Sequence, residues 1–137
     1  MTHSAPVDCE MRVALPGRLE AVEEFFAEFR RKSQALRNRV DGFAAELLVR
    51  EALTNAVVHG CHGDARKQVR CCLRLKNHRL LIAVEDDGDG FDWRSAARHP
   101  AAFADCSGRG MEILRKYANH VRYNQRGNGV AMVKRLR

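Results

Sequence analysis

The stretch from Val49 to Asp64, VREALTNAVVHGCHGD, places polar side chains at regular intervals in an otherwise apolar segment. Glu51, Asn55 and His59 follow one another at four-residue spacing, so in an α-helix they lie along one face. A carboxylate can accept a proton, an amide oxygen can bind a hard cation, and an imidazole can bind a metal or cap a helix. The alternative is that these residues form the solvent side of an amphipathic helix, and this segment alone leaves both interpretations open.

A second candidate segment, AVEDDGDGFDW, leaves an apolar strand directly into Asp86, with Gly88 and Gly90 following. A carboxylate at a strand end with glycines two and four residues later is typical of a place where the backbone must come close to a ligand. A calcium-binding loop is the alternative. It is disfavoured because the spacing lacks the remaining ligands and the closing glutamate of such a loop.

The third candidate segment, DCSGRGMEIL, places Gly108 and Gly110 at the start of a helix. Unobstructed amides at a helix N-terminus can hold an anion such as a phosphate. One Gly-x-Gly pair is equally well explained by a turn. The three segments in this order form a more specific pattern than any of them alone.

Hydrophobic periodicity predicts the elements that carry these segments. We expect a strand at 9–15, helices at 18–36 and 43–59, a hairpin of strands at 68–76 and 79–87 around Asn77 and His78, a helix at 111–120, and a second hairpin at 121–136. The stretch 88–110 is poorly periodic, with at most one helical turn at 93–97. This order predicts an α+β fold, a two-layer sandwich in which helices cover one face of a mixed, mostly antiparallel sheet.

Composition limits the possible classes of protein. The 137 residues suit a single domain, 1–137, with 45% hydrophobic and 30% charged residues. There is no apolar run near the ~20 residues of a membrane span and no signal-peptide pattern, so we expect a cytoplasmic protein without membrane contact. The five cysteines are expected to be reduced, and zinc is disfavoured because no CxxC or HxxxH spacing supports it.

The net charge of +7 raises the question of nucleic-acid binding. The basic residues are spread along the whole chain, however, and no recognition-helix or RNP-type motif accompanies them. We therefore expect no direct nucleic-acid contact. A basic surface suits an acidic protein partner or a polyanionic nucleotide equally well.

Together the three segments resemble the GHKL, or Bergerat, ATP-binding fold of gyrases and histidine kinases. The similarity is closest to the small anti-sigma-factor serine kinases of bacterial partner-switching systems. EALTNAVVHG resembles their N box, DDGDG their G1 box and SGRGMEIL their compact G2 box. The resemblance extends from about Glu10 to Arg137.

The resemblance implies roles for individual residues. Asn55 would bind Mg²⁺ through its amide oxygen, and Glu51 would be the general base that takes the proton of an attacking hydroxyl. Asp86 would accept a hydrogen bond from the adenine amino group, while Gly88 and Gly90 would let the backbone approach the nucleotide.

At the phosphate end, the resemblance implies a group of nucleotide-binding residues from the G2 box, namely Ser107, Gly108, Arg109, Gly110 and Met111. The segment 91–106 would form a lid over them. His59 would either complete the metal's surroundings or cap its helix, and these alternatives stay open.

The implied function is that of an ATP-dependent protein serine kinase that acts as an anti-sigma factor. Such a protein uses ATP/ADP and Mg²⁺, forms a homodimer, phosphorylates a STAS-domain anti-anti-sigma protein and sequesters a sigma factor. The alternative is a non-catalytic module of the same fold in which nucleotide gates protein binding. The presence of Glu51 favours the kinase, because binding alone would not require a base one turn from the metal ligand.

The sequence departs from the family pattern at two places. Val130 and Ala131 stand where the family usually places a threonine that helps the aspartate to hold adenine. Arg109 replaces a residue that is often small or apolar, and it would reach the γ-phosphate, contact the partner or have no role.

Overall fold

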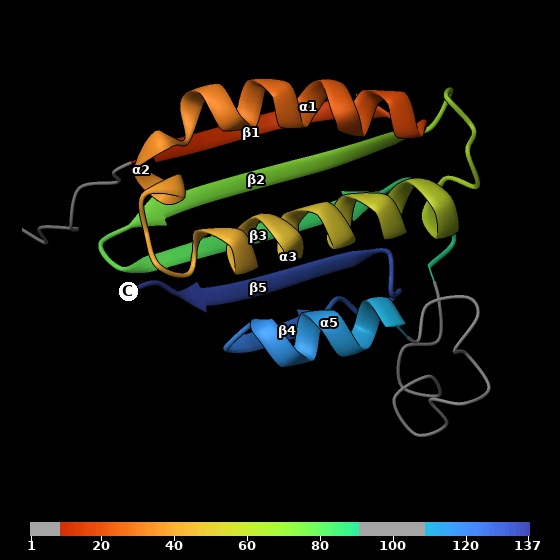
Figure 1. Ribbon diagram of the computed structural model, residues 1–137. Helices are drawn as coiled ribbons and strands as arrows, with labels where there is room; N and C mark the ends of the chain where they lie inside the picture. Colours follow the sequence, from red (N-terminus) through yellow and green to blue (C-terminus); the bar gives the residue numbers. More distant parts are fainter. Residues whose placement is uncertain (1–8, 91–108) are drawn as a thin grey trace, which may run out of the picture.

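The computed structural model describes residues 9–90 and 109–137 (Figure 1). The first half contains β1 (Cys9–Pro16), α1 (Leu19–Lys32), α2 (Gln34–Arg37), α3 (Gly42–Asn55) and the π-helical segment η1 (Ala56–Gly60). The rest contains β2 (Gln68–Lys76), β3 (Arg79–Asp86), α5 (Arg109–Tyr117), β4 (His120–Tyr123) and β5 (Gly129–Arg135). The expected order of strands and helices is confirmed. The helical turn expected at 93–97 and the segment 91–106 lie outside the described residues.

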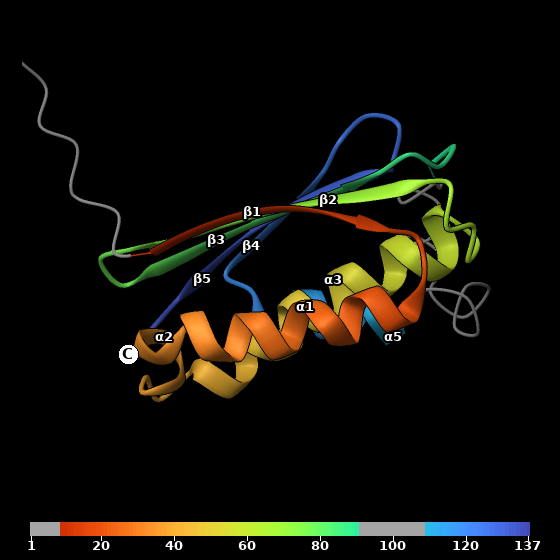
Figure 2. The same cartoon turned by 90° about the horizontal axis from the view of Figure 1, so that it is seen from above.

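The strands form one five-stranded sheet in the order β1-β2-β3-β5-β4. All four strand pairs are antiparallel, so no parallel pair occurs among the described strands. Figure 2 shows α1, α3 and α5 together on one face of the sheet. This arrangement confirms the α+β class, with a sheet that is antiparallel rather than mixed over the described residues.

The core lies between the sheet and the helices. On α1, the rings of Phe25, Phe26 and Phe29 pack against one another, with ring centroids 5.2 to 5.7 Å apart. On the sheet, alternate residues of β2 and β3 are buried, as expected for strands with one covered face. This alternation decides which side chains reach the helical face.

The first long helix ends earlier than its periodicity predicts. Ser33 separates α1 from α2, and its hydroxyl donates a hydrogen bond to the carbonyl of Phe29. The backbone N–H of Ser33 donates to the same carbonyl, and a serine hydroxyl on a carbonyl four residues earlier often bends a helix, in line with the break at this residue. Among the described residues, no helix has the length and apolar character needed to cross a lipid bilayer.

Candidate functional site

A hollow lies between the α3–η1 helix, the ends of β3 and β5, and the facing parts of α5 and β4. It is lined by Ala52, Asn55, Ala56, His59, Val84, Asp86, Leu114, Tyr123, Gly127, Asn128, Gly129 and Val130. Asn55 of the N box and Asp86 of the G1 box are far apart in the sequence, yet they line the same hollow. The fold therefore brings together three of the residues that the sequence singled out, Asn55, His59 and Asp86.

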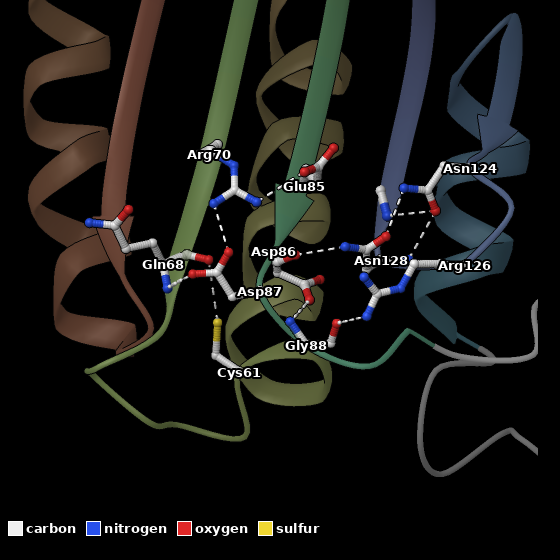
Figure 3. A network of polar contacts seen from close by, with 11 residues as sticks. Cys61, Gln68, Arg70, Glu85, Asp86, Asp87, Gly88, Asn124, Arg126 and Asn128 are labelled. Atoms are coloured by element: carbon white, nitrogen blue, oxygen red, sulfur yellow. Dashed lines mark hydrogen bonds and ion pairs between the residues drawn. The ribbon is translucent and has the colours of Figure 1, made fainter.

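Asp86 reaches this hollow because of its place in the alternation of β3. It continues the buried series of Ile82 and Val84, so its carboxylate lies on the helical face, where the residue is only 7% exposed. Its Oδ1 accepts the backbone N–H of Gly88 at 2.7 Å (Figure 3). Burial raises the pKa of this carboxyl, and the Gly88 hydrogen bond opposes that rise.

The neighbouring Asp87 has a different environment. Its carboxylate is bound to the guanidinium of Arg70 at 2.7 Å and accepts the backbone N–H of Gln68 at 3.0 Å. The hydrogen bond from Arg70 lowers the pKa of Asp87. Asp87 thus fastens the G1 box to β2 on the outer side, and Asp86 is the carboxylate that faces the hollow.

Two glycines enclose the Asp86 carboxylate. A Cβ at Gly60 would lie 2.3 Å from the carboxylate carbon of Asp86, and a Cβ at Gly88 would lie 2.2 Å from the carbonyl oxygen of Gly60. Real Cβ atoms do not approach other atoms so closely, and no larger residue fits at either position without displacement. The end of the N box and the G1 box are therefore packed directly against each other at Asp86.

The N-box helix changes its winding at the hollow. It is α-helical up to Asn55 and π-helical from Ala56 to Gly60. Short π segments within helices occur frequently at functional sites. Asn55, before the change of winding, and His59, after it, both line the hollow. Burial lowers the pKa of His59, and the nearby His62 lowers it further. The neutral imidazole is therefore favoured.

Glu51 lies on α3, one turn before Asn55, and is partly buried. It is not among the residues that line the hollow itself. Its proposed role as a general base stays a prediction.

The G2 box lies only partly in the described region. Ser107 and Gly108 lie outside it, as does the segment 91–106 that the resemblance assigns to a lid. Arg109 and Gly110 are the first residues of α5, with Met111 next, and Leu114 of the same helix lines the hollow. The helix α5 therefore runs alongside the candidate site, and the roles of the G2-box residues stay predictions.

Sequence reasoning missed the turn between β4 and β5, which it treated only as a Gly-rich connection. Asn124 and Asn128 of this turn are joined by a hydrogen bond of 2.7 Å, and Asn128 also donates to the backbone carbonyl of Asp86 at 2.8 Å. Two asparagines four residues apart around a glycine are a signal that could have identified this feature.

The departure from the family pattern falls at the hollow. Val130 lines it, directly across from Val84 of β3. Ala131 is exposed and lies on the opposite face of the sheet. Position 130 is thus where a threonine hydroxyl would face the hollow, and this chain has a methyl group in its place.

Comparison with known proteins decides the family. Residues 13–134 match the family described as "Histidine kinase-like ATPase domain". The chain belongs to this family. The histidine kinase-like ATPase domain accounts for almost all of the chain, and membership implies nucleotide binding.

Several curated relatives of this ATPase domain carry the name "Anti-sigma F factor". The protein from Shouchella clausii is 30% identical over 79 residues, which cover 55% of this chain and 54% of that protein. The protein from Oceanobacillus iheyensis is 28% identical over 96 residues, covering 65% of this chain and 66% of that protein. That from Clostridium perfringens strain SM101 is 28% identical over 90 residues, covering 62% and 64%. The chain thus spans about half to two thirds of the length of the relatives it matches.

The hollow of the ATPase domain has a composition that fits an adenine nucleotide. Ala52, Val84 and Leu114 supply apolar walls for a flat ring, and Asp86 supplies an acceptor for an amino group. The described residues contain no group of three or more His, Cys, Asp or Glu side chains that could hold a metal unaided. A single amide such as Asn55 suits Mg²⁺, which keeps several waters and is bound partly by substrate phosphates.

Proposed function

We propose that this chain binds ATP with Mg²⁺ and acts as an anti-sigma regulatory factor with protein serine kinase activity. Its substrate would be a serine of a STAS-domain anti-anti-sigma protein, and it would sequester a sigma factor. The observation that carries the proposal is the meeting of Asn55 and Asp86 in one hollow that has apolar walls. The names of the curated relatives support the regulatory role.

The proposed roles follow from the positions of the side chains. Asp86 accepts the adenine amino group at the buried end of the hollow. Asn55 offers its amide oxygen to the magnesium ion that accompanies the phosphates. Glu51, one turn earlier on α3, accepts the proton that the serine hydroxyl loses as its oxygen bonds to the γ-phosphorus of ATP and ADP leaves.

The G2 box completes the proposed nucleotide site. Its phosphate-binding groups would be the amides of Gly108 and Gly110, with contributions from Ser107, Arg109 and Met111. The start of α5 at Arg109 supports this assignment, because amides at a helix N-terminus attract anions.

The proposed partners are a STAS-domain protein, a sigma factor and a second copy of this chain. The helices occupy one face of the sheet, and no described element covers the other face, which leaves a broad surface available for association (Figure 2). Analytical ultracentrifugation at several protein concentrations tests the homodimer, because a protomer of 15.5 kDa would sediment with twice that mass.

The test of the kinase is phosphoserine formation on STAS proteins incubated with Mg-ATP and this chain. The Glu51→Gln variant should lose phosphoryl transfer while its ATP affinity stays within about tenfold of the original. Glu46→Gln is the matched control, since Glu46 lies on the same helix and pairs with Arg30 away from the hollow.

Three outcomes separate the possibilities. Absence of adenine-nucleotide uptake by the unmodified chain would overturn the proposal as a whole. Uptake without transfer to any STAS protein would favour the non-catalytic module in which nucleotide gates protein binding. Loss of ATP binding in Glu51→Gln would make Glu51 a structural residue or a metal ligand.

A further inference from the structure

The turn between β4 and β5 is organised by one asparagine side chain. Asn124 Oδ1 accepts the backbone N–H groups of Gly127, Asn128 and Gly129 at 2.8, 3.0 and 3.2 Å. Asn124 Nδ2 donates to Asn128 Oδ1 at 2.7 Å (Figure 3). The side chain of Asn124 thus holds both the backbone of the turn and the side chain of Asn128.

Asn128 in turn binds the backbone of Asp86 from both sides. The Asp86 N–H donates to the carbonyl of Asn128 at 2.9 Å, which continues the β3–β5 ladder one step beyond the pair of Glu85 and Gly129. In a regular antiparallel ladder the Asn128 N–H would donate back to the Asp86 carbonyl. Here that N–H donates to Asn124, and the side-chain Nδ2 of Asn128 donates to the Asp86 carbonyl instead, at 2.8 Å.

The same turn packs against the rest of the G1 box. Arg126 Nη2 donates to the carbonyl of Gly88 at 3.4 Å. A Cβ at Gly90 would lie 1.8 Å from the carbonyl oxygen of Arg126, and Gly90 has a φ of +88°, which favours glycine. The turn therefore touches the G1 box at residues 86, 88 and 90.

We propose that Asn124 and Asn128 are positioning residues for nucleotide recognition, which orient Asp86 and so set the preference for adenine. This inference rests on the proposed nucleotide function. The two residues act through Asp86. The amide of Asn128 fixes the peptide group of residue 86, and this fixes the direction in which the carboxylate enters the hollow.

The location of Asn128 supports a role in recognition. Asn128 is 8% exposed and lines the hollow. Val130, two residues further along the chain, also lines the hollow and has no hydroxyl to help hold a base. A regular backbone hydrogen bond from residue 128 to the carbonyl of residue 86 would complete the β3–β5 ladder without the side-chain amides of Asn124 and Asn128. In this chain, the turn supports the peptide group of Asp86, while Gly88 binds its carboxylate.

The experiment compares ADP and GDP affinities, measured by calorimetry with Mg²⁺, in the full chain and three variants. Asn128→Ala removes the donor to Asp86. Asn124→Asp keeps the acceptor for the three turn amides but removes the donor to Asn128, whose amide must then turn and release the Asp86 carbonyl. Asn119→Ala is the matched control, because Asn119 Oδ1 accepts the backbone N–H of Arg135 at 2.7 Å at the far end of the same strand pair.

We expect Asn128→Ala and Asn124→Asp to lower the preference for ADP over GDP by about tenfold, the effect of losing one well-placed hydrogen bond. The affinity for inorganic tripolyphosphate, which lacks a base, should stay unchanged in both. Asn119→Ala should keep the ADP preference even if its melting temperature falls as far as theirs.

The inference is overturned if Asn124→Asp, with its turn intact, keeps the full preference for ADP. It is also overturned if ADP and tripolyphosphate lose affinity equally in both variants, which would indicate general loosening. If the unmodified chain binds neither ADP nor GDP, the proposed function itself fails.

Discussion

Gly60 lies so close to the carboxylate of Asp86 that a Cβ at position 60 would be 2.3 Å from the carboxylate carbon. The contact joins the last residue of η1 to the last residue of β3. It fixes the spacing between helix and sheet at the buried end of the hollow. The smallest possible side chain at position 60 is thus a requirement for the position of Asp86.

The substitution Gly60→Ala should displace the Asp86 carboxylate and lower ADP affinity by at least about tenfold, because a buried acceptor would be misplaced. Overpacking should also lower the free energy of unfolding by about 1–3 kcal/mol. Calorimetry and denaturant titration measure the two effects.

Gly63→Ala is the control for this experiment. Gly63 has a φ of +73°, so alanine there is strained, but its Cβ would meet nothing within 4 Å. This variant should lose about 1 kcal/mol of stability and keep its ADP affinity. Equal loss of affinity in both variants would show that stability alone governs binding.

Asp86→Asn should lower ADP affinity without lowering the free energy of unfolding at neutral pH. Asparagine keeps an acceptor for the Gly88 amide but carries no charge, and it should lower ADP affinity by about tenfold or more. Burial raises the pKa of Asp86 above its ordinary value of 3.8, so its contribution to stability is present below that value and is lost as pH rises through the folded pKa.

The variant should therefore be at least as stable as the original chain at pH 7, with a difference that grows as the pH rises from about 4. Denaturant titrations at several pH values provide the measurement. The quantity compared is the free energy of unfolding of the variant minus that of the original chain. A fall in this difference between acidic and neutral pH would contradict the assigned environment of Asp86.

Val130→Thr restores a hydroxyl that faces the hollow and should raise ADP affinity several-fold, by about 1 kcal/mol of hydrogen bonding. Ala131→Thr places the same group on the opposite, exposed face and should leave affinity unchanged. The comparison is made by calorimetry with Mg²⁺ present. If both variants behave alike, the hydroxyl at position 130 has no part in base recognition.

Asn55→Ala should reduce the effect of magnesium on nucleotide affinity by about tenfold, since it removes the one protein oxygen assigned to the ion while the phosphates still bind it. The measurement is ADP binding with Mg²⁺ and with EDTA. Thr54→Ala on the same turn is the control, because Thr54 does not line the hollow. A Mg²⁺ effect of unchanged size in Asn55→Ala would place the ion's protein ligand elsewhere.

Much of the fold could be predicted from the sequence because its patterns are strong. The alternation of β2 and β3 and the acidic-to-basic progression of α1 each identify an element without tertiary information. The position of Asp86 on the buried face also follows from the alternation, since it is in phase with Val84. The break at Ser33 and the π winding after Asn55 could not be predicted, because they depend on local hydrogen bonds that compete with an otherwise helical pattern.

The candidate site was predictable only where a residue acts through its own side-chain chemistry. Asn55 and Asp86 have such chemistry and line the hollow, whereas the role of Glu51 stays a prediction. Gly60 and Asn128 act through contacts with Asp86 from distant parts of the chain. The spacing of Asn124 and Asn128 around Gly127 could have indicated an organised turn, but no local pattern shows that this turn or Gly60 contacts Asp86.

The direction of β5 has a practical consequence. This strand begins at Gly129 beside the hollow and runs to Arg135, about 20 Å away by ordinary strand geometry, and Figure 1 shows the C-terminus at the end of the molecule opposite to the N-box turn. A fluorescent label or purification tag attached after Arg137 would thus stand clear of the hollow. Immobilising the protein through that point would leave the hollow accessible for binding measurements on a sensor surface.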